Sequence, residues 1–418
     1  MTPSHAALQE VPKISTSDAF VPPDDLFDKV KALVPLVQST AAQAERDARL
    51  DDAVMQGLVD SGYMTMLAPR EVGGSEAPPA LIIDCVEEIS YADGSAGWAS
   101  MASAATVGVF LAVLPDDGAK AMLASDNCLS AGSVPRPGKA RPVDGGYVVS
   151  GRFSFASGGA HAGWFSGSYL VVDDDGVPVL DQPGGSPYPL VALIPREHTD
   201  VLGNWDVMGL VATASYDYEF TDVFVPEAMI AREASPLRGG ALYTMGAKAA
   251  PGLGHTGFAL GVARRALDEL KLLAESKQRP PSGLLARHHA LQRDFADWTT
   301  QLRAAGAYAR SSYTRIYEAA LDGKPISAEL HADCRMATSH AVFTAADIVK
   351  DAYIASGADG LRNGNPLQRC FRDIFAGTQH MYTAQHTYVS AGRIYLDTPG
   401  LTDAHRAMMT TTFTPPLP

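Results

Sequence analysis

The stretch YVVSGRFSFASGGAHAGW, residues 147–164, decides how the whole chain is interpreted. It predicts two short strands, 147–150 and 153–157, joined by a tight turn at Ser150-Gly151. Successive side chains alternate across a strand, so the aromatic residues of the second strand are expected on one face of a sheet.

Ser157 ends the second predicted strand beside Gly158 and Gly159. Glycines let the main chain approach a planar ligand closely, and a serine hydroxyl can bind the polar edge of that ligand. A serine that only completes a turn is the structural alternative. Spacing alone therefore leaves two interpretations open here, the end of a hairpin and a ligand site.

Length and charge limit the class of protein. The chain has 418 residues, 46% of them hydrophobic, with a net charge of −14 and a pI near 5.2. This size suits two or three packed domains, and the acidic balance argues against nucleic acid or an anionic membrane as partners. The N-terminus has no apolar run behind a basic start, so neither a signal peptide nor a membrane anchor is expected.

The four cysteines are far apart and form no CxxC pair, which argues against a structural metal site or a disulfide framework. They are Cys85, Cys128, Cys334 and Cys370. Reduced thiols indicate a cytoplasmic protein, and no metal is expected.

Composition changes twice along the chain and predicts three domains. Residues 24–126 have helical periodicity, residues 127–235 consist of short β-rich runs between Gly and Pro turns, and residues 236–397 are helical again. The last domain is expected to hold four long helices with short links, the fourth at 367–395.

Three side chains are candidates for chemistry from their own context. Asp373 and His380 are seven residues apart in LQRCFRDIFAGTQH, so on one helix they would share a face and point into one cleft. Trp98 lies in an apolar stretch rich in small residues. A satisfied or surface histidine and a core tryptophan are the structural alternatives.

Several segments, in order, resemble the acyl-CoA dehydrogenase superfamily over residues 27–397. They are LAPREVGG, YADGSAGWASM, CLSAGSVPRPGKA, FASG and NWDVMGLVATASYDYEFTDVFVPE. The resemblance implies an α+β chain with an N-terminal α-helical domain, a central β-barrel and a C-terminal four-helix bundle, assembled as a homotetramer.

The same resemblance implies roles for residues around a flavin. Phe155 would pack on the isoalloxazine ring, Ser157 would bind near N5, and Ala131 to Ser133 would bring backbone groups to the pyrimidine. A neighbouring subunit would supply Arg279 and Gln292.

The region of the catalytic base resembles one branch of the superfamily. Met381 falls where dehydrogenases carry their glutamate, whereas R-D-x-x-A-G-x-x-H resembles the oxygenase components of two-component flavin monooxygenases. This implies that His380 is an acid or base, assisted by Ser157 and Asp373. The pocket groups would be Trp98, His161 and Trp205.

The expected reaction is therefore hydroxylation of a small aromatic, phenol- or indole-like, with O₂ and reduced FMN or FAD. The chain has no GxGxxG after a strand and no phosphate-binding GxxxxGK[ST] loop, so NAD(P)H would be oxidised by a separate flavin reductase.

Two other functions remain open from the sequence. An acyl-CoA dehydrogenase-like enzyme with a relocated base would hold FAD tightly and oxidise an acyl thioester. A catalytically silent flavoprotein scaffold or binding protein would show no flavin-dependent turnover with any reductant.

Overall fold

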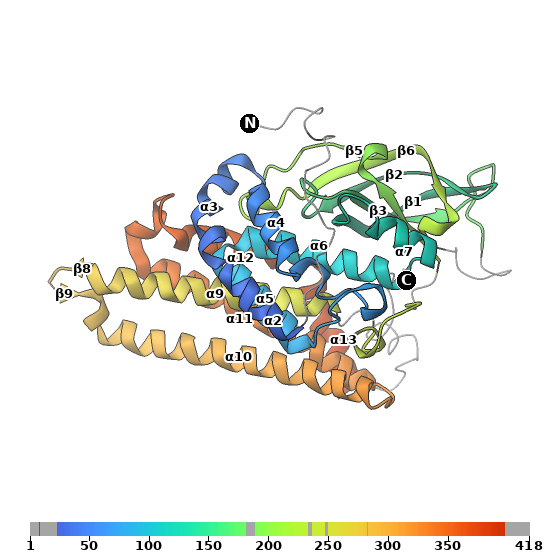
Figure 1. The fold of residues 1–418 in the computed structure, drawn as a ribbon. Helices are drawn as coiled ribbons and strands as arrows, with labels where there is room; N and C mark the ends of the chain where they lie inside the picture. Colours follow the sequence, from blue (N-terminus) through green and yellow to red (C-terminus); the bar gives the residue numbers. More distant parts are fainter. Residues whose placement is uncertain are drawn as a thin grey trace.

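The computed structural model describes residues 8, 23–180, 189–232, 236–246, 250–281 and 283–397, with only the backbone described at 23, 134–136 and 189. Two groups of helices pack on one another and a twisted sheet lies at one end of them (Figure 1). The β8–β9 hairpin lies at the opposite end of the long helices (Figure 1).

The N-terminal helices are α2 (Pro23–Ala32), α3 (Val34–Asp47), α4 (Asp52–Asp60), α5 (Pro79–Ala92), α6 (Gly94–Val113) and α7 (Asp116–Leu123). The strands are β1 (Ser130–Val143), β2 (Gly146–Ala156), β3 (Trp164–Val171), β4 (Pro189–Pro195), β5 (Asp200–Val201), β6 (Tyr216–Pro226) and β7 (Ile230–Ala231).

The C-terminal helices are α8 (Ala241–Thr244), α9 (Ala250–Ser276), α10 (His289–Leu321), α11 (Ala328–Ser356), α12 (Pro366–Gly377) and α13 (His386–Tyr395). Strands β8 (Gln278–Arg279) and β9 (Gly283–Leu284) link α9 to α10. Two short 3-10 helices adjoin the site, η4 (Val211–Thr213) and η8 (Met381–Thr383).

The predicted closed barrel is wrong for the part of the chain that is described. The seven strands form an open sheet in the order β5-β6-β2-β1-β3-β4-β7, with β1 and β3 parallel and the other pairs antiparallel. A buried group of rings fills its inner face, where Phe153 stacks on Tyr218 with centroids 5.4 Å apart. The outermost strands have two residues each and do not pair with each other, which leaves the sheet open.

The predicted tight turn at Ser150-Gly151 is also wrong. Strand β2 is continuous, and its pairing with β6 shifts register between Val149 and Gly151 and again between Phe153 and Ala156. At the second shift Phe155 has φ +68°, so its side chain leaves the face that Phe153 occupies and is 66% exposed. The Ser150-Gly151 pair therefore marks a change of register within one strand and not a turn between two strands.

Helix α6 is the central apolar element, and the side chain of Asp93 accepts a hydrogen bond from the Ala96 backbone N–H at its start. By length and composition it could cross a membrane, but 72% of its most apolar window is buried inside the protein. One side of α6 packs on α9 and the other on β1, so Trp98 lies between helical and sheet layers.

The fourth long helix predicted at 367–395 is broken, so a four-helix bundle is not confirmed. Helix α12 ends at Gly377, and a Cβ at this position would lie 2.5 Å from Phe258 and 3.2 Å from Trp98. His380 therefore lies beyond the helix, and the argument that it shares a helical face with Asp373 is wrong. The predicted domain limits at 126/127 and 235/236 remain predictions.

A buried group of charges joins α3, α5 and α12. Arg369 contacts Asp93 at 3.1 Å, and Arg372 pairs with Glu45. Asp373 receives the Leu210 backbone N–H on Oδ1 at 2.6 Å, while its Oδ2 is buried with no hydrogen-bond partner. Burial, and then the nearby Asp93 carboxyl, raise the pKa of Asp373. With both arginines paired to other acids, Asp373 is held as the neutral acid.

The raised pKa of Asp373 makes the folded protein less stable as pH rises. The neutral form is favoured in the folded protein, so its contribution is complete below the ordinary carboxyl pKa and is lost as pH rises toward the folded value. We expect Asp373→Asn to remove this dependence, because an amide oxygen still accepts from the Leu210 N–H. The free energy of unfolding of the wild type should therefore fall relative to the variant by up to about 1.4 kcal/mol per pH unit across that window.

Urea unfolding at several pH values from 5 to 8 measures this difference. Asp347→Asn is the matched control, because Asp347 is exposed on α11 and should leave the pH profile parallel to that of the wild type. Parallel profiles for the wild type and Asp373→Asn would show that Asp373 is ionised in the folded protein.

Candidate active site

A chain of hydroxyl groups runs inward from the end of β2. Ser157 Oγ accepts a hydrogen bond from Trp98 Nε1 at 3.2 Å and lies 2.8 Å from Ser215 Oγ. Ser215 Oγ lies 2.7 Å from Thr213 Oγ1, which donates to the Leu210 carbonyl at 2.7 Å. Ser157 is thus connected to both α6 and η4. Sequence reasoning found Ser157 and Trp98 but missed Ser215 and Thr213, although both lie in the quoted VATAS segment.

An exposed apolar surface lies beside this row of hydroxyl groups. Phe155 meets Trp205 edge to face with ring centroids 6.1 Å apart. Met208 is 58% exposed, and Trp205 is fixed by its indole N–H, which donates to the Leu210 carbonyl at 3.1 Å. A flat ring system laid here would cover apolar side chains and bring its polar edge to Ser157. The residues present therefore fit a flavin ring.

On the helical side, Trp98 is surrounded by aromatic and imidazole rings. The rings of His255, Phe258 and His380 lie 5.2, 5.0 and 5.7 Å from it, all edge to face. His380 and His255 are 4.4 Å apart between ring centroids, so two histidines share the cluster. The structure thus brings together Trp98, Ser157 and His380 as expected.

His255 was missed from the sequence, because a histidine in an apolar helix gives no signal beyond its polarity. It is buried, and its Nδ1 donates to the Pro251 carbonyl one turn earlier at 2.7 Å. Its Nε2 has no partner. Burial, and then His380, lower the pKa of His255 well below its ordinary value, so the ring is neutral.

The tautomer of His380 follows from its backbone contact. Its Nδ1 accepts the Tyr382 backbone N–H at 3.2 Å, so the proton of the neutral ring is on Nε2. The residue is exposed, yet its ring packs against the rings of Trp98 and His255. The neighbouring rings desolvate the imidazole, and this desolvation, followed by the charge of Arg335, lowers the pKa of His380 to about 4. His380 therefore presents an N–H donor.

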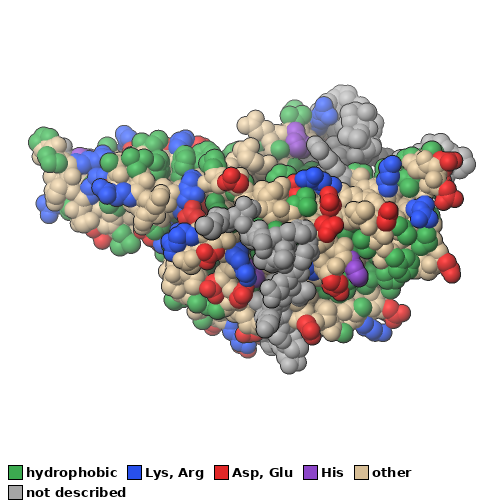
Figure 2. Space-filling model, turned by 90° about the horizontal axis from the view of Figure 1, so that it is seen from above, with side chains coloured by type: hydrophobic (Ala, Val, Ile, Leu, Met, Phe, Trp, Pro, Cys, Tyr) green, Lys and Arg blue, Asp and Glu red, His purple; other side chains and the backbone are tan. Residues whose placement is uncertain are grey.

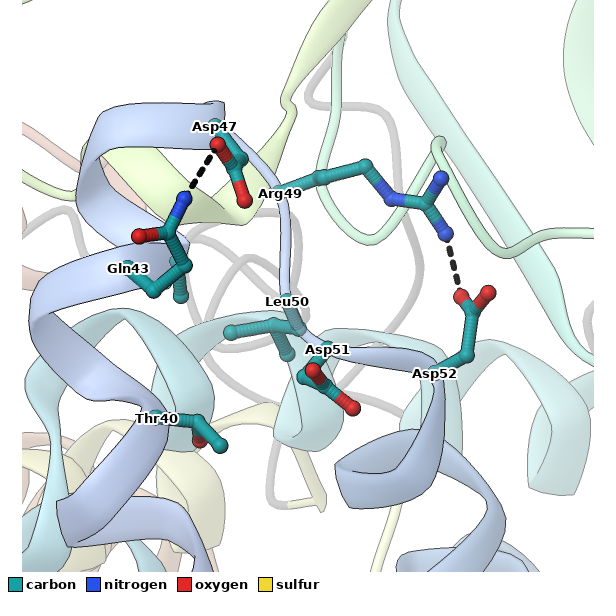
Figure 3. Close-up of a pocket in the computed structure, with 8 residues that line it drawn as sticks. Thr40, Gln43, Asp47, Arg49, Leu50, Asp51 and Asp52 are labelled. Carbon is teal, nitrogen blue, oxygen red and sulfur yellow. Dashed lines mark hydrogen bonds and ion pairs between the residues drawn. The ribbon is translucent and has the colours of Figure 1, made fainter.

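His161 lies in a different group. Its ring is buried, with Nε2 at 3.1 Å from Asp52 Oδ1 and 3.2 Å from an Arg49 nitrogen. Burial lowers the pKa of His161. Figure 3 shows Arg49 and Asp52 meeting beside a hollow of about 170 Å³ between α3 and α4. Residues Thr40, Gln43, Ala44, Asp47, Leu50 and Asp51 complete this hollow, which none of the predicted site residues line.

Other predicted flavin contacts are less available within one chain. Ala131 is buried in β1, and the Ser133 N–H already donates to the Tyr218 hydroxyl at 2.9 Å. Arg279 donates to the Ala355 carbonyl at 2.8 Å, and Gln292 donates to the Ala286 carbonyl at 3.0 Å. Arg279 lies in β8 and Gln292 near the start of α10, at the end of the helices away from the sheet (Figure 1).

Comparison with known proteins matches this architecture. The acyl-CoA dehydrogenase N-terminal domain matches residues 28–120, and the acyl-CoA dehydrogenase C-terminal domain matches residues 253–385. The crystal structure of 3-HSA hydroxylase from Rhodococcus sp. RHA1 superposes with a TM-score of 0.80 at 26% identity, covering 90% of this chain and 97% of that one.

Two curated relatives extend over most of the chain. Indole-3-acetate monooxygenase of Pseudomonas putida is 32% identical over 378 residues, which cover 87% of this chain and 92% of that protein. The oxygenase component of the FADH(2)-dependent resorcinol hydroxylase of Rhizobium sp. (strain MTP-10005) is 27% identical over 387 residues, covering 85% and 90%. The chain therefore belongs to the acyl-CoA dehydrogenase superfamily, in its branch of oxygenase components of two-component flavin-dependent monooxygenases.

Proposed function

We propose that this protein hydroxylates a small phenol- or indole-like aromatic with O₂ and reduced FMN or FAD, the flavin being reduced by a separate NAD(P)H-dependent reductase. The observation that carries the proposal is the arrangement around Trp98, whose indole N–H binds Ser157 and whose ring packs against His380. The names of relatives that act on indole-3-acetate and resorcinol support an electron-rich aromatic ring as the substrate.

The flavin, when bound, supplies the oxygen-activating chemistry, and the chain supplies binding, orientation and exclusion of water. Phe155 and Trp205, whose rings meet edge to face, would cover the ring system, and Ser157 would bind its N5 edge. Trp98 joins this edge to the buried helical core, because its indole N–H binds Ser157 and its ring packs on Phe258. Because the proton of His380 is on Nε2, the ring donates a hydrogen bond to the polar group of the substrate and orients it.

Arg279 and Gln292 reach the flavin from a neighbouring subunit of a homotetramer in a cytoplasmic enzyme. The distance between their end of the helices and the sheet supports a shared site (Figure 1). Figure 2 shows basic side chains over this end of an otherwise acidic protein, which suits a phosphate-bearing cofactor of another subunit. The chain around β8 and β9 carries Lys271, Lys277, Arg279 and Arg287, of which Lys277 pairs with Asp359.

Replacing His380 by Ala is expected to lower product formation by about 10²-fold, the usual contribution of one positioned acid or donor, while flavin affinity is unchanged. Single-turnover product yield with chemically reduced flavin is the measurement. His340→Ala, an exposed histidine on α11, is the control. Unchanged turnover in His380→Ala would remove His380 from the mechanism.

The lowered pKa of His380 adds a pH test. The ring stays neutral until pH falls toward about 4, so the ratio of wild-type to His380→Ala turnover should be constant from about pH 6 to 8. A ratio that changes with a midpoint near the ordinary histidine pKa would contradict a neutral donor.

The shared site is tested by complementation between inactive variants. If Arg279 serves the flavin of another subunit, coexpressed Arg279→Ala and His380→Ala should form mixed assemblies that contain intact sites. If the two variants assemble at random in equal amounts, about one quarter of the sites combine an intact His380 with an intact Arg279 from the neighbouring subunit. We therefore expect about one quarter of the wild-type activity. The control pair, Ser157→Ala with His380→Ala, should recover nothing, because both residues come from one chain. Equal recovery in both pairs, or in neither, would contradict a shared site.

A further inference from the structure

We infer that Ser215 and Thr213 are positioning residues that fix Ser157 as a hydrogen-bond acceptor, so that the site selects reduced flavin over oxidised flavin. The inference rests on the proposed function, in which Ser157 meets flavin N5. It goes beyond that function by assigning a redox preference to two residues that do not touch the cofactor.

The direction of the hydroxyl chain is set at its two ends. The Leu210 carbonyl can only accept, so the Thr213 hydroxyl at 2.7 Å donates its hydrogen there. Thr213 oxygen then receives the hydrogen of Ser215, and Ser215 oxygen receives that of Ser157, at 2.7 and 2.8 Å. At the outer end the Trp98 indole N–H can only donate, and it donates to Ser157.

The burial of Thr213 and Ser215 maintains this donor-to-acceptor direction of the hydrogen bonds. Thr213 is fully buried and Ser215 is 3% exposed, so solvent offers neither hydroxyl another partner. Reversing the direction of these hydrogen bonds would bring the Thr213 hydroxyl oxygen and the Leu210 carbonyl oxygen face to face at 2.7 Å with no hydrogen between them. The chain therefore has one favourable polarity.

Ser157 itself is half-buried, so its oxygen remains accessible. Its hydrogen is directed inward to Ser215 and one lone pair receives Trp98, which leaves one lone pair for a ligand. Reduced flavin carries a hydrogen on N5 and can donate to that lone pair. Oxidised flavin has a lone pair on N5, so two acceptors would face each other.

Such a preference suits an enzyme that shares its flavin with a reductase. The reduced cofactor is bound on arrival, and the oxidised cofactor loses its hydrogen bond to Ser157 after turnover. Release of oxidised flavin is then favoured by the protein rather than left to competition in solution.

The test compares dissociation constants of FMN and FAD in both redox states. Oxidised flavin is titrated by fluorescence, and dithionite-reduced flavin by anaerobic ultrafiltration. Three variants are used: Ser215→Ala and Thr213→Val, which release the Ser157 hydrogen, and Ser215→Thr, which keeps the hydroxyl.

The wild type should bind reduced flavin more tightly than oxidised flavin. In Ser215→Ala and Thr213→Val this preference should shrink by about fivefold or more, as expected for one hydrogen bond, mainly because oxidised flavin binds better. Ser215→Thr should keep the wild-type ratio. A purely structural role for Ser215 would weaken both redox states together and leave the ratio unchanged.

The inference is overturned if the wild type binds both states equally, or if both hydroxyl-deleting variants keep its ratio. In either case flavin still binds and the proposed function stands. If the wild type binds neither redox state, the proposed function fails together with the inference, and this result is distinct because no flavin affinity is measured. Thr213→Val is close in shape to the wild-type side chain, so it decides the matter if Ser215→Ala does not fold.

Discussion

The main chain of Leu210 is the point on which the arrangement of the site depends. Its carbonyl accepts from Thr213 and Trp205, and its N–H reaches Asp373 on α12. Leu210 has φ +55°, a left-handed conformation that costs about 1 kcal/mol or more for a branched residue and persists only when its surroundings fix it. These three hydrogen bonds supply that constraint, and the one to Asp373 joins the loop between β5 and β6 to α12.

The protonation state of the buried Asp373 also stabilises the contact between the Leu210 loop and α12. An ionised Asp373 without a cation would cost several kcal/mol in a buried site, and the two nearby arginines already pair with Asp93 and Glu45. Protonating Asp373 costs less free energy than burying its unpaired charge, and the neutral acid still accepts a hydrogen bond from the Leu210 N–H. Gly209 lets the loop approach closely, since a Cβ there would lie 2.2 Å from the Arg372 carbonyl oxygen. The loop between β5 and β6 is therefore positioned by contacts of its main chain with Arg372 and Asp373 of α12.

Sequence reasoning predicted which side chains come together better than it predicted the backbone geometry that brings them together. The order helices, strands, helices follows from periodicity, and Trp98, Ser157 and His380 do come together. The bulge at Phe155 could not be read from alternation, because a bulge preserves the pattern on either side. At Gly377, where α12 ends, Phe258 and Trp98 leave no room for a side chain, and both lie far away in sequence. His255 and the hydroxyls of Thr213 and Ser215 matter only through partners that the fold supplies.

The central claim is that the protein transfers oxygen from O₂ to an aromatic ring with flavin reduced elsewhere. The most direct measurement is mass spectrometry of the product after the protein, chemically reduced FMN or FAD and a phenol or indole are mixed with isotopically heavy dioxygen. We predict a hydroxylated ring that carries the heavy oxygen, formed without any reductase present. A ring that stays unmodified while an acyl-CoA bleaches the bound FAD would contradict this account and identify a dehydrogenase instead.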